Sequence, residues 1–511
     1  MRSRSATTAA RYTSHVVRVA VLEAALFGLA CGVPQAAVAE DMPAFAPGMI
    51  GHMQQMKQFK DADQGSQPTP PVIPRFGTAT DPSGAIGTFQ PNGATFTNNN
   101  GFFQNLGTNG RTCFTCHQPQ SGWTVSAAGV AERFSASGGT DPIFRVVDGA
   151  TCPSDDVSTL AAKQTAYKLL TEKGLIRIGL PLPAGVQFAV TRVDDPYNCN
   201  TNRVTGLTST TTGIVSTYRR PLPATNLGFL STIMWDGREP SLTSQATDAT
   251  LGHAQAKTQP NAAVLAEIVA FESGIFTAQT VDNQAGNLAD GGATGGPIAL
   301  SLQLPNFFIG VNDPLGNNPT SAPFTSQIFD VFRPWLAPGS GDVVAARQSI
   351  ARGEEVFNNT AIKITGVAGL NDVLNVQSVA GFCGTCHDTP NVGNHSVKAP
   401  LDIGIADAGA NAPPGLDISG LPVFTLKCMQ GPLKGKVYRV TDPGRATISG
   451  QCADIGKLKG PILRGLASRA PYFHNGSAAT LMDVVNFYDQ RFKIGFTDQQ
   501  KTDLVNFLNA L

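Results

Sequence analysis

The chain has 511 residues, too many for one typical domain, and 41% of them are hydrophobic, enough to bury sizeable cores. Lys and Arg (37) balance Asp and Glu (37), and the absence of any basic run or stripe argues against a nucleic-acid-binding protein. Gly (54) and Pro (35) are abundant, which predicts long loops.

The N-terminus has the pattern of a secretory signal peptide, residues 1–39. Four arginines lead into an apolar run at 19–33, and Ala37-Val38-Ala39 is an A-x-A cleavage site. The run is too short to span a membrane. We therefore expect a periplasmic protein that is not integral to the membrane. Lipid anchoring at Cys31 is disfavoured, because Gly28 stands where a branched apolar residue is preferred.

The pattern C-x-x-C-H occurs at residues 113–117 and again at 383–387. It is the attachment signature of c-type haem, in which two thiols add to the porphyrin vinyl groups and the histidine ligates the iron. A zinc site would need further ligands, and a thioredoxin-type pair does not call for the histidine. Two covalently bound haem c groups are predicted, held by Cys113, Cys116, His117, Cys383, Cys386 and His387.

Four further cysteines remain beyond the signal peptide. An even remainder in an exported protein suggests two disulfides. Order along the chain favours Cys152 with Cys199 and Cys428 with Cys452, while two other pairings remain possible.

The remaining elements are predicted in chain order. Residues 40–94, rich in Met, Gln and Pro near their start, are expected to form an arm or linker. Residues 139–217 have strand-like pieces and are expected to be an insertion in the first domain. Apolar spacing predicts helices at 262–273 and from Asp342 to about Phe357, and a capping box at Thr497 and Gln500 predicts a closing helix. The fold is predicted to be mainly α: two tandem cytochrome c-type domains, 95–338 and 339–511, with long loops and insertions containing some β structure.

Three segments together resemble the bacterial di-haem cytochrome c peroxidase and MauG family. They are the haem motifs, M-W-D-G-R at 234–238, and L-R-G at 463–465 followed by A-P-Y-F-H-N-G at 470–476. The resemblance covers about residues 101–511. It implies that the first haem meets hydrogen peroxide and that the second relays electrons. The electrons would come from a small donor protein, a cytochrome or cupredoxin, or from a protein substrate.

The resemblance also assigns the first haem pocket. Trp235 is expected to lie between the haems, and Gln245 matches the family glutamine ten residues later. The family glutamate that follows is replaced by Gln255, which cannot transfer protons as a carboxylate can. His253 is the titratable candidate nearby, as a base, an iron ligand or a structural residue.

At the second haem the resemblance implies Tyr488 as the distal iron ligand, which is the MauG-like choice. Met429 and Met482 are the rival ligands. Arg464 is expected to pair with a haem propionate, and His474 is expected in the haem pocket. Calcium between the domains is a further cofactor that the resemblance allows, although no matching asparagine is found.

Three functions compete. The first is a peroxide-dependent, MauG-like oxidoreductase, which Tyr488 favours. The second is an electron carrier without an open iron, which a His253 ligand would favour. The third is an oxygenase of the di-haem rubber-oxygenase type, which a stable dioxygen complex would favour.

Overall fold

The computed structural model describes residues 69–200 and 214–511. The predicted signal peptide and residues 40–68 of the predicted arm lie outside this range. The last part of that arm is folded, because it forms strands of a sheet. Within the described ranges, no helix is both long and apolar enough to cross a membrane.

The described residues mix helices and strands, so the expectation of a mainly α fold is not confirmed. The α-helices are α1 (Ala127–Ser137), α2 (Leu160–Ala166), α3 (Lys168–Lys173), α4 (Leu242–Gly252), α5 (Ala262–Gly274), α6 (Pro297–Ser301), α7 (Asp342–Asn359), α8 (Ala446–Ser449), α9 (Leu481–Phe492) and α10 (Asp498–Asn509). The strands are β1 (Val72–Ile73), β2 (Phe76–Asp81), β3 (Gly84–Phe89), β4 (Thr95–Phe96), β5 (Ile176–Pro181), β6 (Phe188–Asp194), β7 (Ile214–Arg219), β8 (Phe276–Asp282), β9 (Gly286–Asn287), β10 (Ile362–Thr365), β11 (Ser378–Gly381), β12 (Val423–Cys428) and β13 (Val437–Val440).

The predicted helices are found with small shifts at their ends. Asn261 begins α5 by accepting a hydrogen bond from the Val264 backbone amide. Thr497 and Gln500 form the expected capping box at α10. At α7 the N-cap is Gly341, one residue before the predicted Asp342.

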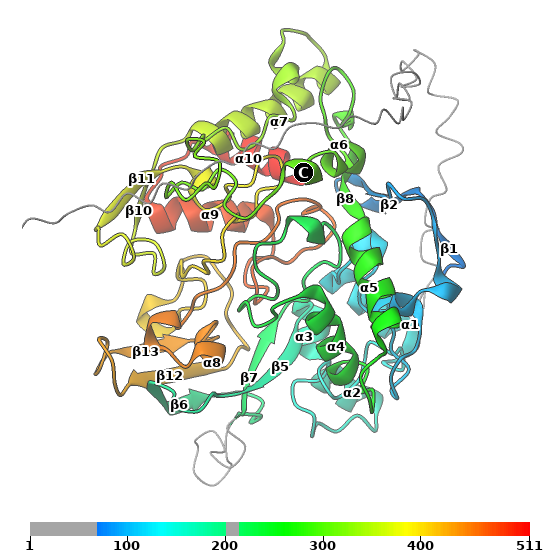
Figure 1. The fold of residues 1–511 in the computed structure, drawn as a ribbon, viewed down its shortest axis with the longest axis vertical. Helices are drawn as coiled ribbons and strands as arrows, with labels where there is room; N and C mark the ends of the chain where they lie inside the picture. Colours follow the sequence, from blue (N-terminus) through cyan, green and yellow to red (C-terminus); the bar gives the residue numbers. More distant parts are fainter. Residues whose placement is uncertain (1–68, 201–213) are drawn as a thin grey trace, which may run out of the picture. The chain divides into compact units, whose positions relative to one another are not determined.

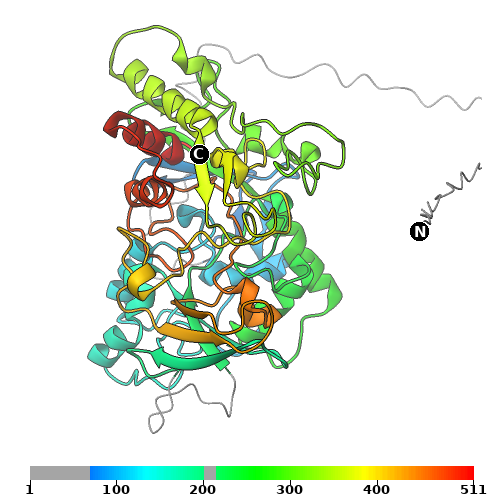
Figure 2. The same cartoon turned by 90° about the vertical axis from the view of Figure 1, so that its left-hand side faces the viewer.

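Two helices far apart in sequence, α7 and α10, lie side by side (Figures 1 and 2). Gly353 is needed at their crossing, because a Cβ there would lie 2.0 Å from the Asp503 carbonyl oxygen. Phe357 of α7 and Phe507 of α10 are buried in the same apolar core as Trp335. This core contains residues from 285 to 511, so part of the predicted first domain packs with the second. The domain boundaries themselves stay a prediction.

A separate apolar core surrounds the first haem motif. Phe114 of the motif packs in it with Phe102, Trp123 and, from α5, Phe271. The rings of Trp123 and Phe271 meet edge to face at 5.4 Å between centroids, a favoured aromatic geometry. Each haem motif therefore has its own apolar support.

The insertions form β structure and are joined to one another. The strand-like pieces expected within 139–217 include β6, which pairs with β12 from the second half of the chain to make the sheet β13-β12-β6. The disulfides Cys152–Cys199 and Cys428–Cys452 are both present, which confirms the favoured pairing and removes the two alternatives. Strands β2, β3, β8 and β9 form a separate antiparallel sheet.

A buried ion-pair network ties these parts together. Arg219, at the end of β7, donates to Asp442 at 2.6 and 2.9 Å and to Asp236 at 2.5 Å. Arg238 also donates to Asp236, at 3.1 Å. The side chains of Arg219, Asp236 and Asp442 are at most 2% exposed, so each charge depends on its partners for solvation.

This network predicts a large effect of Asp442→Asn on stability. The buried Arg219 would lose the charge of one of its two carboxylate partners, which should lower the free energy of unfolding by about 3 to 5 kcal/mol. Thermal and denaturant unfolding, followed by circular dichroism, would measure the change. The control is Asp194→Asn, at a pair whose Arg192 side chain is 70% exposed, which should change stability by less than about 1 kcal/mol. Equal effects of the two substitutions would contradict the prediction.

Candidate functional site

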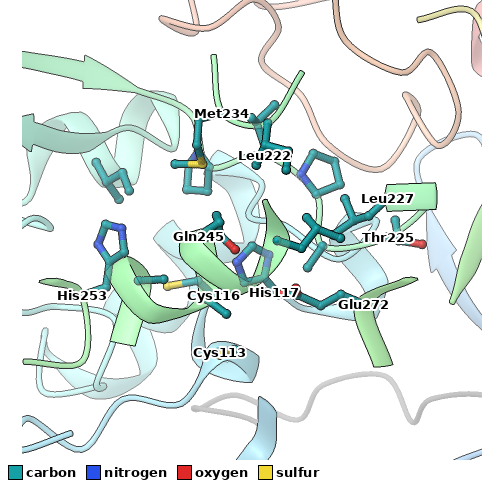
Figure 3. A pocket seen from close by; sticks show the side chains of 18 of the residues that line it. Cys113, Cys116, His117, Leu222, Thr225, Leu227, Met234, Gln245, His253 and Glu272 are labelled. Atoms are coloured by element: carbon teal, nitrogen blue, oxygen red, sulfur yellow. The ribbon is translucent and has the colours of Figure 1, made fainter. Parts of the chain in front are cut away.

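The first cavity opens beside the first haem motif, and about 1670 Å³ of its space, counted out into the open solvent, is not filled by protein atoms. Cys113, Cys116 and His117 line it (Figure 3). Neither cysteine is in a disulfide. Two free thiols and an imidazole on one wall are the donor set that haem c requires.

The second cavity, of about 1680 Å³, has the same chemistry. Cys383, Cys386 and His387 line it, and both cysteines are free. The structure therefore gives each predicted haem motif its own cavity of similar size.

Both motif histidines are oriented by a backbone carbonyl. The Nδ1 atom of His117 lies 2.8 Å from the Trp123 oxygen, and that of His387 lies 2.7 Å from the Gly393 oxygen. A carbonyl accepts only, so Nδ1 carries the proton in each ring and Nε2 is left as the ligand atom. Burial lowers the pKa of His117 to about 4, which keeps the ring neutral and able to bind iron.

The two cavities share a wall. It is formed by Arg220, Pro221, Leu222, Pro223, Trp235, Lys459, Pro461 and Arg469, which line both. Trp235 donates from Nε1 to the Arg220 carbonyl oxygen at 2.8 Å, and this bond holds the indole in place. Trp235 therefore lines both cavities, and its position between two haems stays a prediction.

Four cations in this region form no salt bridge among the described residues. They are Arg220, Lys459, Arg464 and Arg469, all buried or half-buried, and none forms an ion pair with a carboxylate among the described residues. Burial lowers the pKa of Lys459 to about 7 and that of Arg464 to about 10. Nη1 of Arg464 has no hydrogen-bond partner.

Buried cations without counter-charges are costly, so the cavities are suited to anionic groups. The carboxylates of haem propionates supply such charges, and a guanidinium binds a carboxylate well. The predicted propionate partner Arg464 lines the first cavity. The residues present therefore fit haem in both thiol chemistry and charge.

The structure separates the three predicted distal residues. Gln245 of α4 and His253, which caps it, line the first cavity, but Gln255 does not. Gln255 is exposed and accepts a hydrogen bond from Asn109 at 3.2 Å. Helix α4 ends at Gly252, and the chain turns at Gln255 with φ +56°, so spacing from Trp235 no longer predicts which side chains face the cavity.

A carboxylate that the sequence did not reveal orients His253. Asp148 Oδ2 lies 2.5 Å from His253 Nδ1, and its Oδ1 accepts from Arg111 at 2.6 Å. Burial opposes ionisation of Asp148, but Arg111 and His253 together outweigh it and hold the pKa of this carboxyl below its usual value. Asp148 lies in the predicted insertion, where no motif marked it.

Glu272 was also missed. It is 5% exposed, lines the first cavity, and burial raises the pKa of its carboxyl to about 8. A signal was present, because Glu272 follows Ile268 by four residues and so interrupts the apolar face of α5.

At the second cavity, Tyr488 of α9 is a lining residue. Its hydroxyl makes no hydrogen bond with the described residues, and burial raises the pKa of the phenol. The rival Met429 is 51% exposed, and neither it nor Met482 lines the cavity. The placement favours Tyr488 among the predicted ligands.

The predicted pocket residue His474 also lines the second cavity. It is fully buried, and its ring centroid lies 6.2 Å from that of Trp235. Its Nε2 atom lies 3.7 Å from Asp442, and burial lowers the pKa of His474 to about 4.

Calcium was the further cofactor that the resemblance allowed. The described residues contain no cluster of three or more His, Cys, Asp and Glu side chains that could hold an ion. A calcium site made of carbonyl oxygens stays a prediction.

Comparisons with known proteins match short stretches of the chain. No protein-family profile matches. The chain is 37% identical over 89 residues to cytochrome-c peroxidase IdrP1 of Denitromonas iodatirespirans (15% of this chain, 21% of that protein). It is 42% identical over 78 residues to IdrP2 of the same organism (14% and 21%). The matches thus span about a fifth of these relatives. They confirm, for these stretches, the resemblance to cytochrome c peroxidases that the motifs indicated.

Two solved structures are similar at low TM-scores. A MauG-like protein associated with microbial copper homeostasis has 17% identity and a TM-score of 0.31, covering 59% of this chain and 75% of that one. A variant of the diheme peroxidase BthA from Burkholderia thailandensis has 15% identity and a TM-score of 0.29, covering 80% and 83%.

Proposed function

We propose that this relative of the cytochrome-c peroxidases is an exported di-haem c-type oxidoreductase that reduces hydrogen peroxide in the first cavity with electrons delivered through the second. The observation that carries the proposal is the pair of cavities, each with one C-x-x-C-H motif, sharing a wall that contains Trp235. The periplasm is the proposed location, since covalent haem attachment and disulfides both suit an exported protein.

Haem bound in the two cavities would supply the redox chemistry and the iron site for peroxide. The chain would hold the haem groups. In the first cavity Cys113 and Cys116 would form the thioether bonds and His117 would ligate the iron through Nε2. Cys383, Cys386 and His387 would do the same in the second cavity. The four cations without salt bridges would bind the propionate carboxylates and neutralise their negative charge.

His253 is the proposed acid–base residue. Reduction of peroxide to two water molecules needs a proton moved from one peroxide oxygen to the other and further protons delivered. The Asp148 carboxylate accepts from Nδ1 of His253 at 2.5 Å, which fixes the ring and leaves Nε2 for this transfer. Gln245 would hydrogen-bond the substrate without transferring a proton.

Trp235 and Tyr488 are the proposed electron-transfer residues. The indole lies in the wall common to both cavities, where an aromatic ring shortens the path for electrons. Tyr488, facing the second cavity, would ligate the iron there through its phenolate, which favours the oxidised states. The electrons would come from a small donor protein, a cytochrome or cupredoxin, or from a protein substrate.

The first prediction concerns haem attachment. Protein denatured and extracted with acidic acetone should retain two haems, because thioether bonds survive this treatment. Cys116→Ala should weaken retention at the first cavity alone, and Cys386→Ala at the second alone. Haem content by pyridine haemochrome and intact mass would show this. A wild-type protein that loses all its haem on extraction would overturn the proposed function.

The second prediction concerns Tyr488. Electron paramagnetic resonance of the ferric protein should show one high-spin and one low-spin haem, and Tyr488→Phe should remove the low-spin signal while keeping the ring. Tyr472→Phe is the control, because Tyr472 lines the same cavity but its hydroxyl is already bonded to the Leu466 carbonyl oxygen at 3.1 Å. A low-spin signal that survives Tyr488→Phe would show that this residue is packing only.

The third prediction tests the acid–base assignment. His253→Ala should lower the rate of peroxide reduction by about 10² to 10⁴, the usual cost of losing a positioned proton-transfer group. Gln255→Glu should leave the rate unchanged, because that side chain points to solvent. Stopped-flow spectroscopy with stoichiometric peroxide would measure both.

Other outcomes of the same experiment distinguish the remaining functions. A ferric protein with no response to peroxide would indicate an electron carrier. A stable dioxygen complex of the reduced protein, with no response to peroxide, would indicate an oxygenase. An increased rate in Gln255→Glu would show that this loop reaches the cavity in solution.

A further inference from the structure

Met234 lines the first cavity, and no role has yet been assigned to it. Figure 3 shows its thioether across the cavity from Cys113 and Cys116. It belongs to none of the apolar cores formed by the described residues, so packing of a core does not account for its position. It is a polarisable sulfur placed on the surface of the peroxide site.

The backbone of Met234 is in the left-handed region, with φ +64°. A residue with a long side chain rarely adopts this conformation, because its Cβ comes too close to the following carbonyl oxygen. The surrounding structure must therefore impose it. Such strained positions concentrate at functional sites.

The contacts around the turn show what imposes it. The Gly237 amide donates to the Met234 carbonyl oxygen at 3.3 Å, and Ile233 and Glu239 pair as an antiparallel bridge. Between them, Asp236 is held by Arg219 at 2.5 Å and by Arg238 at 3.1 Å. The turn is thus locked by buried ion pairs, and Met234 is directed into the cavity while the adjacent Trp235 enters the shared wall.

A thioether at this place has a defined chemistry. Methionine sulfur is oxidised by peroxide to the sulfoxide, which is polar and is reduced again by methionine sulfoxide reductases. We propose that Met234 is an oxidation site of this protein, modified by peroxide that enters the first cavity. The inference rests on the proposed function, since it requires peroxide to enter there.

The reaction balances with peroxide as the oxidant. The O–O bond breaks and an S–O bond forms at Met234, the sulfur supplies both electrons, and the second oxygen leaves as water with both protons. The sulfoxide places a polar group in the lining of the first cavity, which also includes Gln245 and Trp235. Oxidation therefore lowers activity when peroxide is in excess over the electron donor.

The test treats the holoprotein with increasing equivalents of hydrogen peroxide in the absence of donor and maps methionine oxidation by peptide mass spectrometry. The peptide containing Met234 should gain about 16 Da before any other methionine peptide. Met429 is the internal control, because it is 51% exposed and would react first if oxidation were by peroxide in bulk solution.

Met234→Leu removes the sulfur, with Met429→Leu as the matched control. Relative to its own starting activity, Met234→Leu should lose less activity per equivalent of peroxide than the wild type, and Met429→Leu should lose as much. Oxidation of Met429 ahead of Met234, or of both to the same extent, overturns the inference.

Absorbance spectra of the same samples distinguish a failure of the proposed function from a failure of the inference about Met234. If peroxide is consumed and the haem spectrum responds while Met234 stays unmodified, the proposed function stands and the inference fails. If the haem spectrum does not respond to peroxide at all, the proposed function fails and the inference fails with it.

Discussion

The buried guanidinium of Arg219 is the interaction on which the arrangement of both cavities depends. It is held between Asp442, from the second half of the chain, and Asp236, in the turn that carries Trp235. Neither carboxylate nor the guanidinium can be solvated by water at this depth, so all three stay in place only together. These three groups thereby couple the fold of the insertions to the position of the indole between the two cavities.

Arg238, which also pairs with Asp236, makes this network neutral, and around it the wall of the cavities carries a surplus of positive charge. Arg220, Lys459, Arg464 and Arg469 are held by backbone carbonyls rather than by carboxylates. A folded chain with such a surplus is suited to anionic ligands, and haem propionates match it in charge. Cofactor binding and stability are therefore expected to be linked, because the ligand neutralises charges that the protein leaves unpaired.

The residues on the distal side of the first cavity differ from the family pattern. A glutamate at position 255 would lie outside the cavity here, whereas His253 lies inside it and is oriented by Asp148. That carboxylate comes from residues 139–217, the region interpreted as an insertion. This region thus contributes Asp148 to the lining of the first cavity and is not only a decoration of the surface.

The sequence by itself determined the features that depend on neighbouring residues: both haem motifs, the capping box of Thr497 and Gln500, and the cysteines available for disulfides. Their order along the chain also favoured the pairing that forms. Other features were decided only by the tertiary structure. Asp148 meets His253 across 105 positions and Arg219 meets Asp442 across 223, and no local pattern announces either pair. Gln255 was misplaced because position along a helix predicts direction only while the helix continues, and α4 ends at Gly252. Motifs specify what a segment can bind, but which distant charges meet it depends on how the chain crosses between its strands and helices.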